Sequence, residues 1–182
     1  MARALRHSLI VLLLLALVVG AVMYITGSRP QVSRHQIRID APAPLVFGWV
    51  TDANLAVRWI DGLRERRLES PLAMGQGTRM LDVVELEGRR YELPVEITRW
   101  EPPFAVHLLI QGRSHRSTVK YEIEEVEGGV LLTRTIATRY TGLVSTMFCT
   151  AIHRAEEEKA AADLIRLKEQ IERQEIQLEE ME

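Results

Sequence analysis

The chain has 182 residues, of which 47% are hydrophobic and 26% are charged, and its formal net charge is −2. This length suits one globular domain with an appendage, and the nearly balanced charge argues against nucleic-acid binding, which needs a basic surface. The single cysteine, Cys149, excludes an intrachain disulfide and a cysteine cluster for a metal.

The N-terminal segment is almost wholly apolar. No charged residue occurs between Arg6 and Arg29, and residues 9–27 span roughly 28 Å as a helix, close to the hydrocarbon core of a bilayer. We therefore predict a transmembrane anchor at 9–27, after a short tail at 1–8. The protein is then a single-pass membrane protein whose domain is periplasmic or extracytoplasmic if the source is bacterial. A cleaved signal peptide is the alternative, although the apolar run continues past the tolerable cleavage site at 19–21.

A short linker at 28–33 leads into a series of short elements. Pro42 and Pro44 end a first strand and suit the start of a short helix, and Asn54 is expected to cap a second short helix. Alternating apolar residues between Gly and Pro turns then predict a meander, giving six or seven antiparallel strands. The strands with the clearest pattern are 31–40, 78–86, 89–100, 104–111, 116–126 and 130–140.

One long helix is predicted from Leu143 to the late 170s. A stripe at helical spacing is expected to pack on the sheet; it comprises Val144, Met147, Phe148, Ala151, Ile152, Ala155, Ala162 and Ile165. A second set fits the a and d positions of a coiled coil, which is the alternative; it comprises Leu164, Leu167, Ile171 and Leu178. The acidic end at 174–182 is expected to extend into solvent.

The order of these elements resembles the SRPBCC superfamily, the START and birch-pollen-allergen-like helix-grip proteins. The resemblance covers about 31–173 and is nearest to the polyketide cyclase/dehydrase and lipid transport family. It is carried by IRIDAPAPLVFGWVTDANLAVRW, GQGTRM, EITRWEPPF, GGVLLTRT and LIRLKEQIE. It implies an α+β helix-grip domain at 34–173, preceded here by the predicted transmembrane helix. In that fold a bent antiparallel sheet of six to seven strands wraps around a long C-terminal helix, with a deep apolar cavity between them.

Hairpin register predicts that one arginine faces this cavity. A two-residue loop at 128–129 pairs Arg134 with Ile123 and places it on the inner, apolar face of the sheet. A charge in an apolar interior is costly unless it is paired. Arg134 is therefore expected to pair with an inner-face carboxylate, to reach water at the cavity mouth, or to bind an acidic group of a ligand.

The same reasoning places an acid on the inner face. A two-residue loop at 87–88 pairs Asp82 with Leu93, whereas a three-residue loop places Glu85 there instead. Trp59 is expected to close the second short helix over the end of the cavity, as packing or at its opening. The predicted ligand-binding residues are Arg134, Asp82, Tyr91, Trp59, Tyr121, Leu93, Val106, Leu108 and Phe148.

No motif of known chemistry is present. None of the histidines has the helical spacing of a zinc site, and the chain contains no HExxH, glycine-rich phosphate loop or GxSxG. We therefore expect no metal, no cofactor and no catalytic residue.

The leading hypothesis for function is a membrane-anchored, non-catalytic domain that binds or transfers a hydrophobic ligand such as a lipid. One alternative is an aromatase/cyclase-like enzyme that acts on a bound polyketide or aromatic compound with Arg134, Tyr91 and an inner-face acid. The other alternative is an interaction module. Its protein partner would bind the acidic C-terminal helix, where 155–182 carries ten acidic residues against four basic ones.

Overall fold

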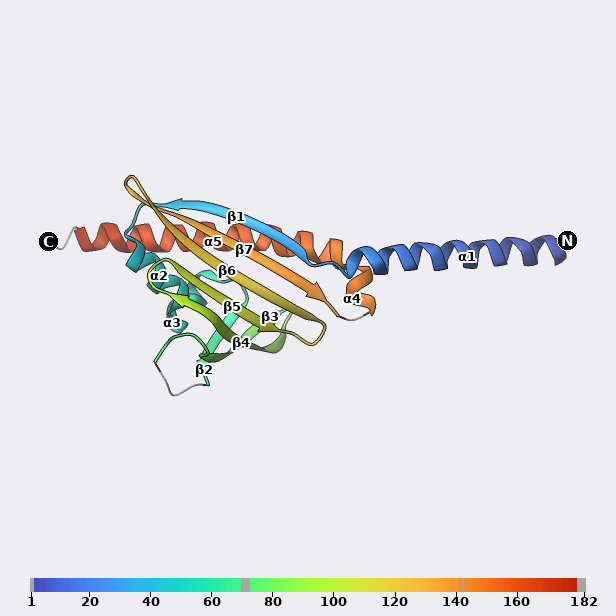
Figure 1. Cartoon of the computed structure of the whole chain (residues 1–182), viewed down its shortest axis with the longest axis horizontal. Helices are drawn as coiled ribbons and strands as arrows, with labels where there is room; N and C mark the ends of the chain where they lie inside the picture. The colour runs from blue at the N-terminus through green and yellow to red at the C-terminus, as the bar shows by residue number, and fades with distance from the viewer. Residues whose placement is uncertain (1, 70–72, 142, 180–182) are drawn as a thin grey trace.

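Seven antiparallel strands form one curved sheet that wraps around the C-terminal helix (Figure 1). The computed structural model describes the backbone of 2–69, 73–141 and 143–179, and the side chains of these residues except 2–5, 8–9, 26, 143 and 176–179. The order across the sheet is β1-β7-β6-β5-β4-β3-β2, so six strands form a meander and β1 closes on the last of them. The strands are β1 Gln31–Ile39, β2 Leu63–Leu68, β3 Arg79–Leu86, β4 Arg89–Glu101, β5 Ala105–Gln111, β6 His115–Val126 and β7 Gly129–Tyr140.

The two tight hairpins differ in how well their register was predicted. In the β3–β4 hairpin Asp82 lies opposite Leu93, as the two-residue loop predicts. In the β6–β7 hairpin the loop is Glu127-Gly128, so Arg134 lies opposite Tyr121 and the predicted partner Ile123 was wrong by two positions. A shift of two residues keeps every side chain on its face. Arg134 is therefore on the inner face in spite of the register error.

Two short helices, α2 Ala43–Thr51 and α3 Ala53–Trp59, cover one end of the sheet. Pro44 stands in the first turn of α2, where its missing N–H has no partner to lose. The cap of α3 differs from the prediction, because the carboxylate of Asp52 accepts the N–H groups of Asn54 and Leu55. Asp52 precedes Asn54 by two residues, which moves the start of the helix accordingly.

The predicted long helix is interrupted at Phe148. It forms α4 Leu143–Met147 and α5 Cys149–Glu179, and α5 runs along the concave side of the sheet (Figure 1). α4 lies against the end of α1, where the Thr146 carbonyl approaches Gly27 so closely that a Cβ there would clash. The small residue at the end of α1 therefore permits this contact.

The face of α5 that packs on the sheet is the opposite of the predicted one. Leu164, Leu167 and Ile171 are buried in the core, whereas Phe148 and Ile165 of the predicted stripe are more than half exposed. The three buried residues are those that fit coiled-coil positions, and here they pack on the sheet and α2 instead. Gln174, one turn further along α5, accepts the indole N–H of Trp49 at 2.9 Å and holds α2 against the helix.

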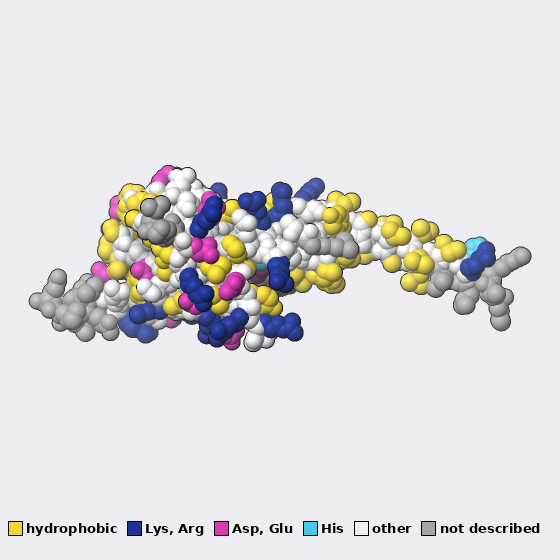
Figure 2. All heavy atoms as spheres, turned by 90° about the horizontal axis from the view of Figure 1, so that it is seen from below, with side chains coloured by type: hydrophobic (Ala, Val, Ile, Leu, Met, Phe, Trp, Pro, Cys, Tyr) yellow, Lys and Arg dark blue, Asp and Glu magenta, His cyan; other side chains and the backbone are white. Residues whose placement is uncertain are grey.

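An N-terminal helix, α1 Ala2–Gly27, projects from the domain, and hydrophobic side chains cover it along its length (Figure 2). Among the residues that the structure describes, no helix is both long enough and apolar enough to cross a membrane. The predicted transmembrane anchor and single-pass membrane localisation are corrected on this finding.

The predicted linker and the predicted acidic end both overlap with observed elements. β1 begins at Gln31, inside the segment predicted as a linker. α5 reaches Glu179 and so includes most of the predicted acidic end at 174–182, of which 180–182 lie outside the described residues. The seven strands and the helices α2 to α5 lie within 31–179, and the domain bounds at 34–173 stay a prediction.

The buried face of α5, formed by Leu164, Leu167 and Ile171, is expected to contribute much of the stability of the domain. Ile171→Ala should lower the free energy of unfolding by about 2–5 kcal/mol, because it removes a side chain with 0% exposure and leaves a cavity. Ile165→Ala is the matched control, since the same substitution at a 53% exposed position of the same helix changes helix propensity equally. Urea unfolding measures both. Equal losses in the two variants would contradict the observed packing face.

Candidate functional site

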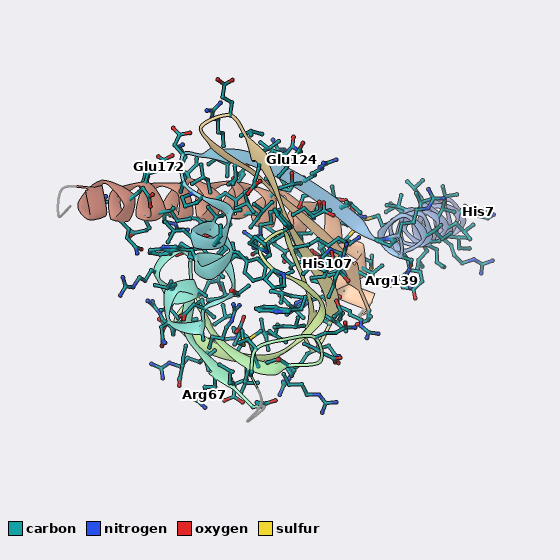
Figure 3. The ribbon with its side chains drawn as sticks, turned by 60° about the vertical axis from the view of Figure 1, so that its left-hand side comes forward. His7, Arg67, His107, Glu124, Arg139 and Glu172 are labelled. Carbon is teal, nitrogen blue, oxygen red and sulfur yellow. The ribbon has the colours of Figure 1, made fainter. Side chains whose placement is uncertain are left out.

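A cavity of about 190 Å³ lies between the inner face of the sheet and α5. Its walls are mainly apolar and come from all seven strands, from the segment after α3 and from α5. The apolar lining residues are Ile60, Leu63, Val84, Leu93, Leu108, Ile110, Val119, Tyr121, Ile136 and Ala160. In Figure 3 side chains fill the rest of the space enclosed by the sheet, and Arg67 lies at its outer edge on β2. Alternation along the strands produces this apolar wall, because every second residue points inward.

One end of the cavity is polar and partly exposed. Asp61, His115, His153, Glu156 and Lys159 line it there. Several of these groups are paired with neighbours: Lys159 lies 3.7 Å from the Asp61 carboxylate, and Glu156 accepts the Tyr140 hydroxyl at 3.0 Å. The lining of the cavity reaches solvent at these residues.

A buried ion pair forms part of the wall. Arg66 on β2 donates from Nε and Nη2 to the two carboxylate oxygens of Asp82 on β3, both at 2.7 Å, and the side chains are 3% and 7% exposed. Burial alone lowers the pKa of the Arg66 guanidinium, but the hydrogen bonds and the charge of Asp82 outweigh it and raise the pKa above its ordinary value. Both oxygens of Asp82 are occupied, so the pair is complete without a ligand.

The second buried arginine, Arg134 on β7, is not complete. Its guanidinium lies beside a T-shaped pair of aromatic rings, 5.9 Å from the Trp59 ring and 5.6 Å from the Tyr121 ring. The nearest carboxylate oxygen, Oδ2 of Asp163 on α5, lies 3.6 Å from Nη1, which is beyond hydrogen-bond distance. Within the described part of the chain, the buried Nε and Nη1 atoms of Arg134 have no hydrogen-bond acceptor. Each such donor costs roughly 1–3 kcal/mol when it is left unmet.

Asp163 faces the charge of Arg134 with Oδ2 but makes no hydrogen bond to it, and its other oxygen is engaged elsewhere. Its Oδ1 accepts the backbone N–H of Asp61 at 3.0 Å and also the guanidinium of Arg166, one turn along α5. Asp163 thus neutralises the charge of Arg134 at a short distance while its hydrogen bonds tie the α3–β2 connection to α5. The arrangement leaves an electrostatically balanced site with free N–H donors.

Tyr121 completes the polar part of the cavity. Burial raises the pKa of its phenol, and the positive charges of Arg134 and Arg66 offset this only in part. The side chain is therefore a neutral phenol near pH 7 and is no base at that pH. Among the residues that the structure describes, no group of three His, Cys, Asp or Glu side chains is placed to hold a metal ion.

The structure brings together five of the nine predicted ligand-binding residues. Asp82, Leu93, Leu108, Tyr121 and Arg134 all line the cavity. The remaining four lie elsewhere.

Trp59 is fully buried behind the Arg134 guanidinium, and its indole N–H donates to the Trp49 carbonyl at 3.2 Å, so it is not at the opening. Val106 is buried in the core beside the cavity. Tyr91 is exposed near the β3–β4 turn, and Phe148 is exposed on the outer side of the α4–α5 junction, in a separate groove. The structure therefore does not place Tyr91 or Phe148 with Arg134.

Two residues of the site, Arg66 and Asp163, were missed from the sequence. Arg66 is one of three arginines within Leu63–Leu68, and the register shift between Leu63 and Glu65 breaks the alternation that selects the inner face. Asp163 had a detectable signal. It lies three residues after Ala160 and four before Leu167, so the three residues share one face of the helix, and all are buried. A single charged residue on an apolar helix face indicates a buried partner of opposite charge.

Comparison with solved structures establishes the fold. The protein TTHA0849 of Thermus thermophilus is 14% identical over 78% of this chain and 97% of its own, with a TM-score of 0.65. The di-domain ARO/CYC protein StfQ of the steffimycin biosynthetic pathway is 8% identical over 81% of this chain and 52% of its own, with a TM-score of 0.67. Ara h 8.0201 is 13% identical over 76% and 98%, with a TM-score of 0.56. This is the helix-grip fold.

The fold agrees with the resemblance to the SRPBCC superfamily. No family model and no curated protein matches the chain. Membership of the polyketide cyclase/dehydrase and lipid transport family therefore stays a prediction. At these identities the likeness is one of fold, and function has to be argued from the cavity itself.

The Arg66–Asp82 pair is expected to be needed for folding. Asp82→Asn should lower the free energy of unfolding by about 3–5 kcal/mol, because it leaves the Arg66 charge buried without a counter-charge. Glu101→Gln is the matched control: it breaks a bidentate pair with Arg99 that is exposed, and little change is expected there. Chemical denaturation measures both.

The double variant Arg66→Met/Asp82→Leu distinguishes an unpaired charge from lost packing. It should be more stable than Asp82→Asn, since neither charge then remains in the interior. If the double variant is less stable than Asp82→Asn, the ion pair contributes more to stability than the neutralisation of two buried charges.

Proposed function

We propose that this chain binds a hydrophobic small molecule, without catalysis, in the cavity between the sheet and α5. The observation that carries the proposal is the cavity wall. It joins contiguous apolar side chains from β2 to β7 to a few polar groups at defined positions, and one end is accessible from solvent. Binding sites for small molecules typically combine an apolar lining with a few orienting polar groups. Burial of the apolar part of a ligand supplies roughly 25 cal/mol per Å².

The size of the cavity limits the ligand. Its volume of about 190 Å³ is below the ~300–1,000 Å³ of pockets for drug-sized ligands, but above the ~150 Å³ of a protein cavity that binds benzene. A molecule with one ring, or one apolar end of a longer molecule, suits this space. The predicted lipid ligand is retained only in that restricted form, with one end of an acyl chain inside the cavity.

The two alternative functions receive less support. Two structural neighbours are ARO/CYC proteins of biosynthetic pathways, but the cyclase-like mechanism predicted here needs Tyr91 beside Arg134. Tyr91 lies exposed near the β3–β4 turn, away from the cavity. The interaction hypothesis rests on the acidic end of α5, where the side chains beyond Glu175 lie outside the described residues. No observation favours either alternative over binding in the cavity.

Binding of a neutral one-ring hydrocarbon tests the proposal. Ethylbenzene at ten times its dissociation constant should stabilise the full-length protein by about 1.4 kcal/mol, seen as a rise in Tm and confirmed by calorimetric titration. Leu93→Trp should abolish the rise, because the larger side chain fills the cavity from its wall. Leu68→Trp makes the same change at an exposed position outside the cavity wall and should leave the rise intact. Absence of binding to the wild type, or full binding to Leu93→Trp, would refute binding in this cavity.

A further inference from the structure

We propose that the ligand of this cavity is a small monoanion, a one-ring or short aliphatic carboxylic acid, whose carboxylate accepts hydrogen bonds from Arg134. This inference rests on the proposed function and specifies the chemical class of its ligand. Its basis is the incomplete state of the Arg134 side chain. The residue is only 8% exposed and lines the cavity, yet Nε and Nη1 have no acceptor among the described residues.

The surroundings of Arg134 leave only the edge of its guanidinium for a new partner. The Trp59 and Tyr121 rings lie 5.9 and 5.6 Å from its central carbon, where aromatic π-faces attract a cation but accept no conventional hydrogen bond. The donors in the plane of the guanidinium are therefore the ones that remain available. A planar carboxylate can accept from two N–H groups on one edge of a guanidinium, as Asp82 does from Nε and Nη2 of Arg66. On that edge of Arg134, Nε has no acceptor among the described residues.

Among the described residues, neither buried carboxylate makes a hydrogen bond to Arg134. Asp82 uses both oxygens on Arg66. Asp163 uses Oδ1 on the Asp61 N–H and on Arg166, and its Oδ2 lies 3.6 Å from Nη1. The described residues thus leave Arg134 without a hydrogen-bond acceptor, and a bound acid would provide one.

Charge and volume restrict the acid further. Arg66 and Asp82 cancel, and Asp163 lies between Arg134 and Arg166, whose side chain is 40% exposed. Asp61 also lies 3.7 Å from Arg166, so these charges are close to balanced. Among the described residues, Arg134 is the buried arginine that lacks a hydrogen-bonded carboxylate, which suits a ligand with one acidic group rather than two. With the carboxylate at Arg134, the apolar part of the ligand lies against Leu93, Leu108, Val119 and Ile136.

A matched pair of probes separates charge from shape. Phenylacetate and phenylacetamide have the same size and differ in the charged group. Calorimetric titration of the full-length wild type at pH 7 should show phenylacetate binding at least about tenfold more tightly, since hydrogen bonds to charged groups contribute more than neutral ones. In Arg134→Met, which keeps an unbranched stem and removes the guanidinium, the preference should fall below about threefold while phenylacetamide affinity changes by less than about twofold.

Control variants identify Arg134 as the cause. Arg67→Met removes an exposed arginine of β2 that lies outside the cavity wall, and it should keep the tenfold preference. If Arg134→Met does not fold, Arg134→Lys serves in its place. It keeps the charge but loses the planar pair of donors, and should lose most of the preference. In the wild type, the ¹H–¹⁵N resonance of Arg134 Nε should shift on addition of phenylacetate and remain nearly unchanged with phenylacetamide.

The outcomes distinguish this inference from the proposed function. Equal affinity of the wild type for acid and amide, or an unchanged preference in Arg134→Met, overturns the assignment of an anionic ligand. If ethylbenzene still binds in that case, the hydrophobic site stands without it. If acid, amide and ethylbenzene all fail to bind, the proposed function and this inference fall together.

Discussion

The structure depends on how two arginines, Arg66 and Arg134, are accommodated in the apolar interior between the sheet and α5. A buried guanidinium is tolerated only when carboxylates or other acceptors surround it. Asp82 accepts two hydrogen bonds from Arg66 across the β2–β3 pair, whereas Asp163 on α5 faces the charge of Arg134 on β7 at 3.6 Å without a hydrogen bond. Asp163 also accepts the Asp61 N–H, so one carboxylate connects the sheet, the long helix and the α3–β2 connection. These contacts surround the cavity and position the elements that line it.

Much of the fold could be predicted because side chains alternate between the two faces of a strand, so a register error of two residues leaves each side chain on its predicted face. The β6–β7 loop was assigned one residue too late, which shifted the pairing register by two positions, yet Arg134 remained on the inner face. The turns of the β3–β4 hairpin and the proline-led α2 follow from local backbone preferences and needed no tertiary information. The arrangement of strands then agrees with the order expected from the resemblance.

The long helix shows where such patterns mislead. The side of α5 that faces the sheet runs through His153, Glu156, Ala160, Asp163, Leu167 and Ile171. It is apolar only where it packs on the core, and it becomes polar where it lines the cavity. The predicted stripe through Phe148 and Ile152 is apolar throughout but exposed. Hydrophobic periodicity therefore selected the wrong face, because a helix that lines a polar-ended cavity places charges on its inner side.

The candidate site was the least predictable part for the same reason. A buried charge is recognisable only with its partner, and the partners of Arg66 and Arg134 lie on elements distant in the sequence or displaced by a bulge. The two arginines also differ in a way that no sequence pattern shows. Asp82 satisfies Arg66 with two hydrogen bonds, as a structural pair requires, whereas Arg134 retains unmet donors beside an apolar space. An interior selected for stability alone would favour an apolar side chain at that position. An arginine that lowers stability and faces a cavity is the kind of local inconsistency that marks a binding site.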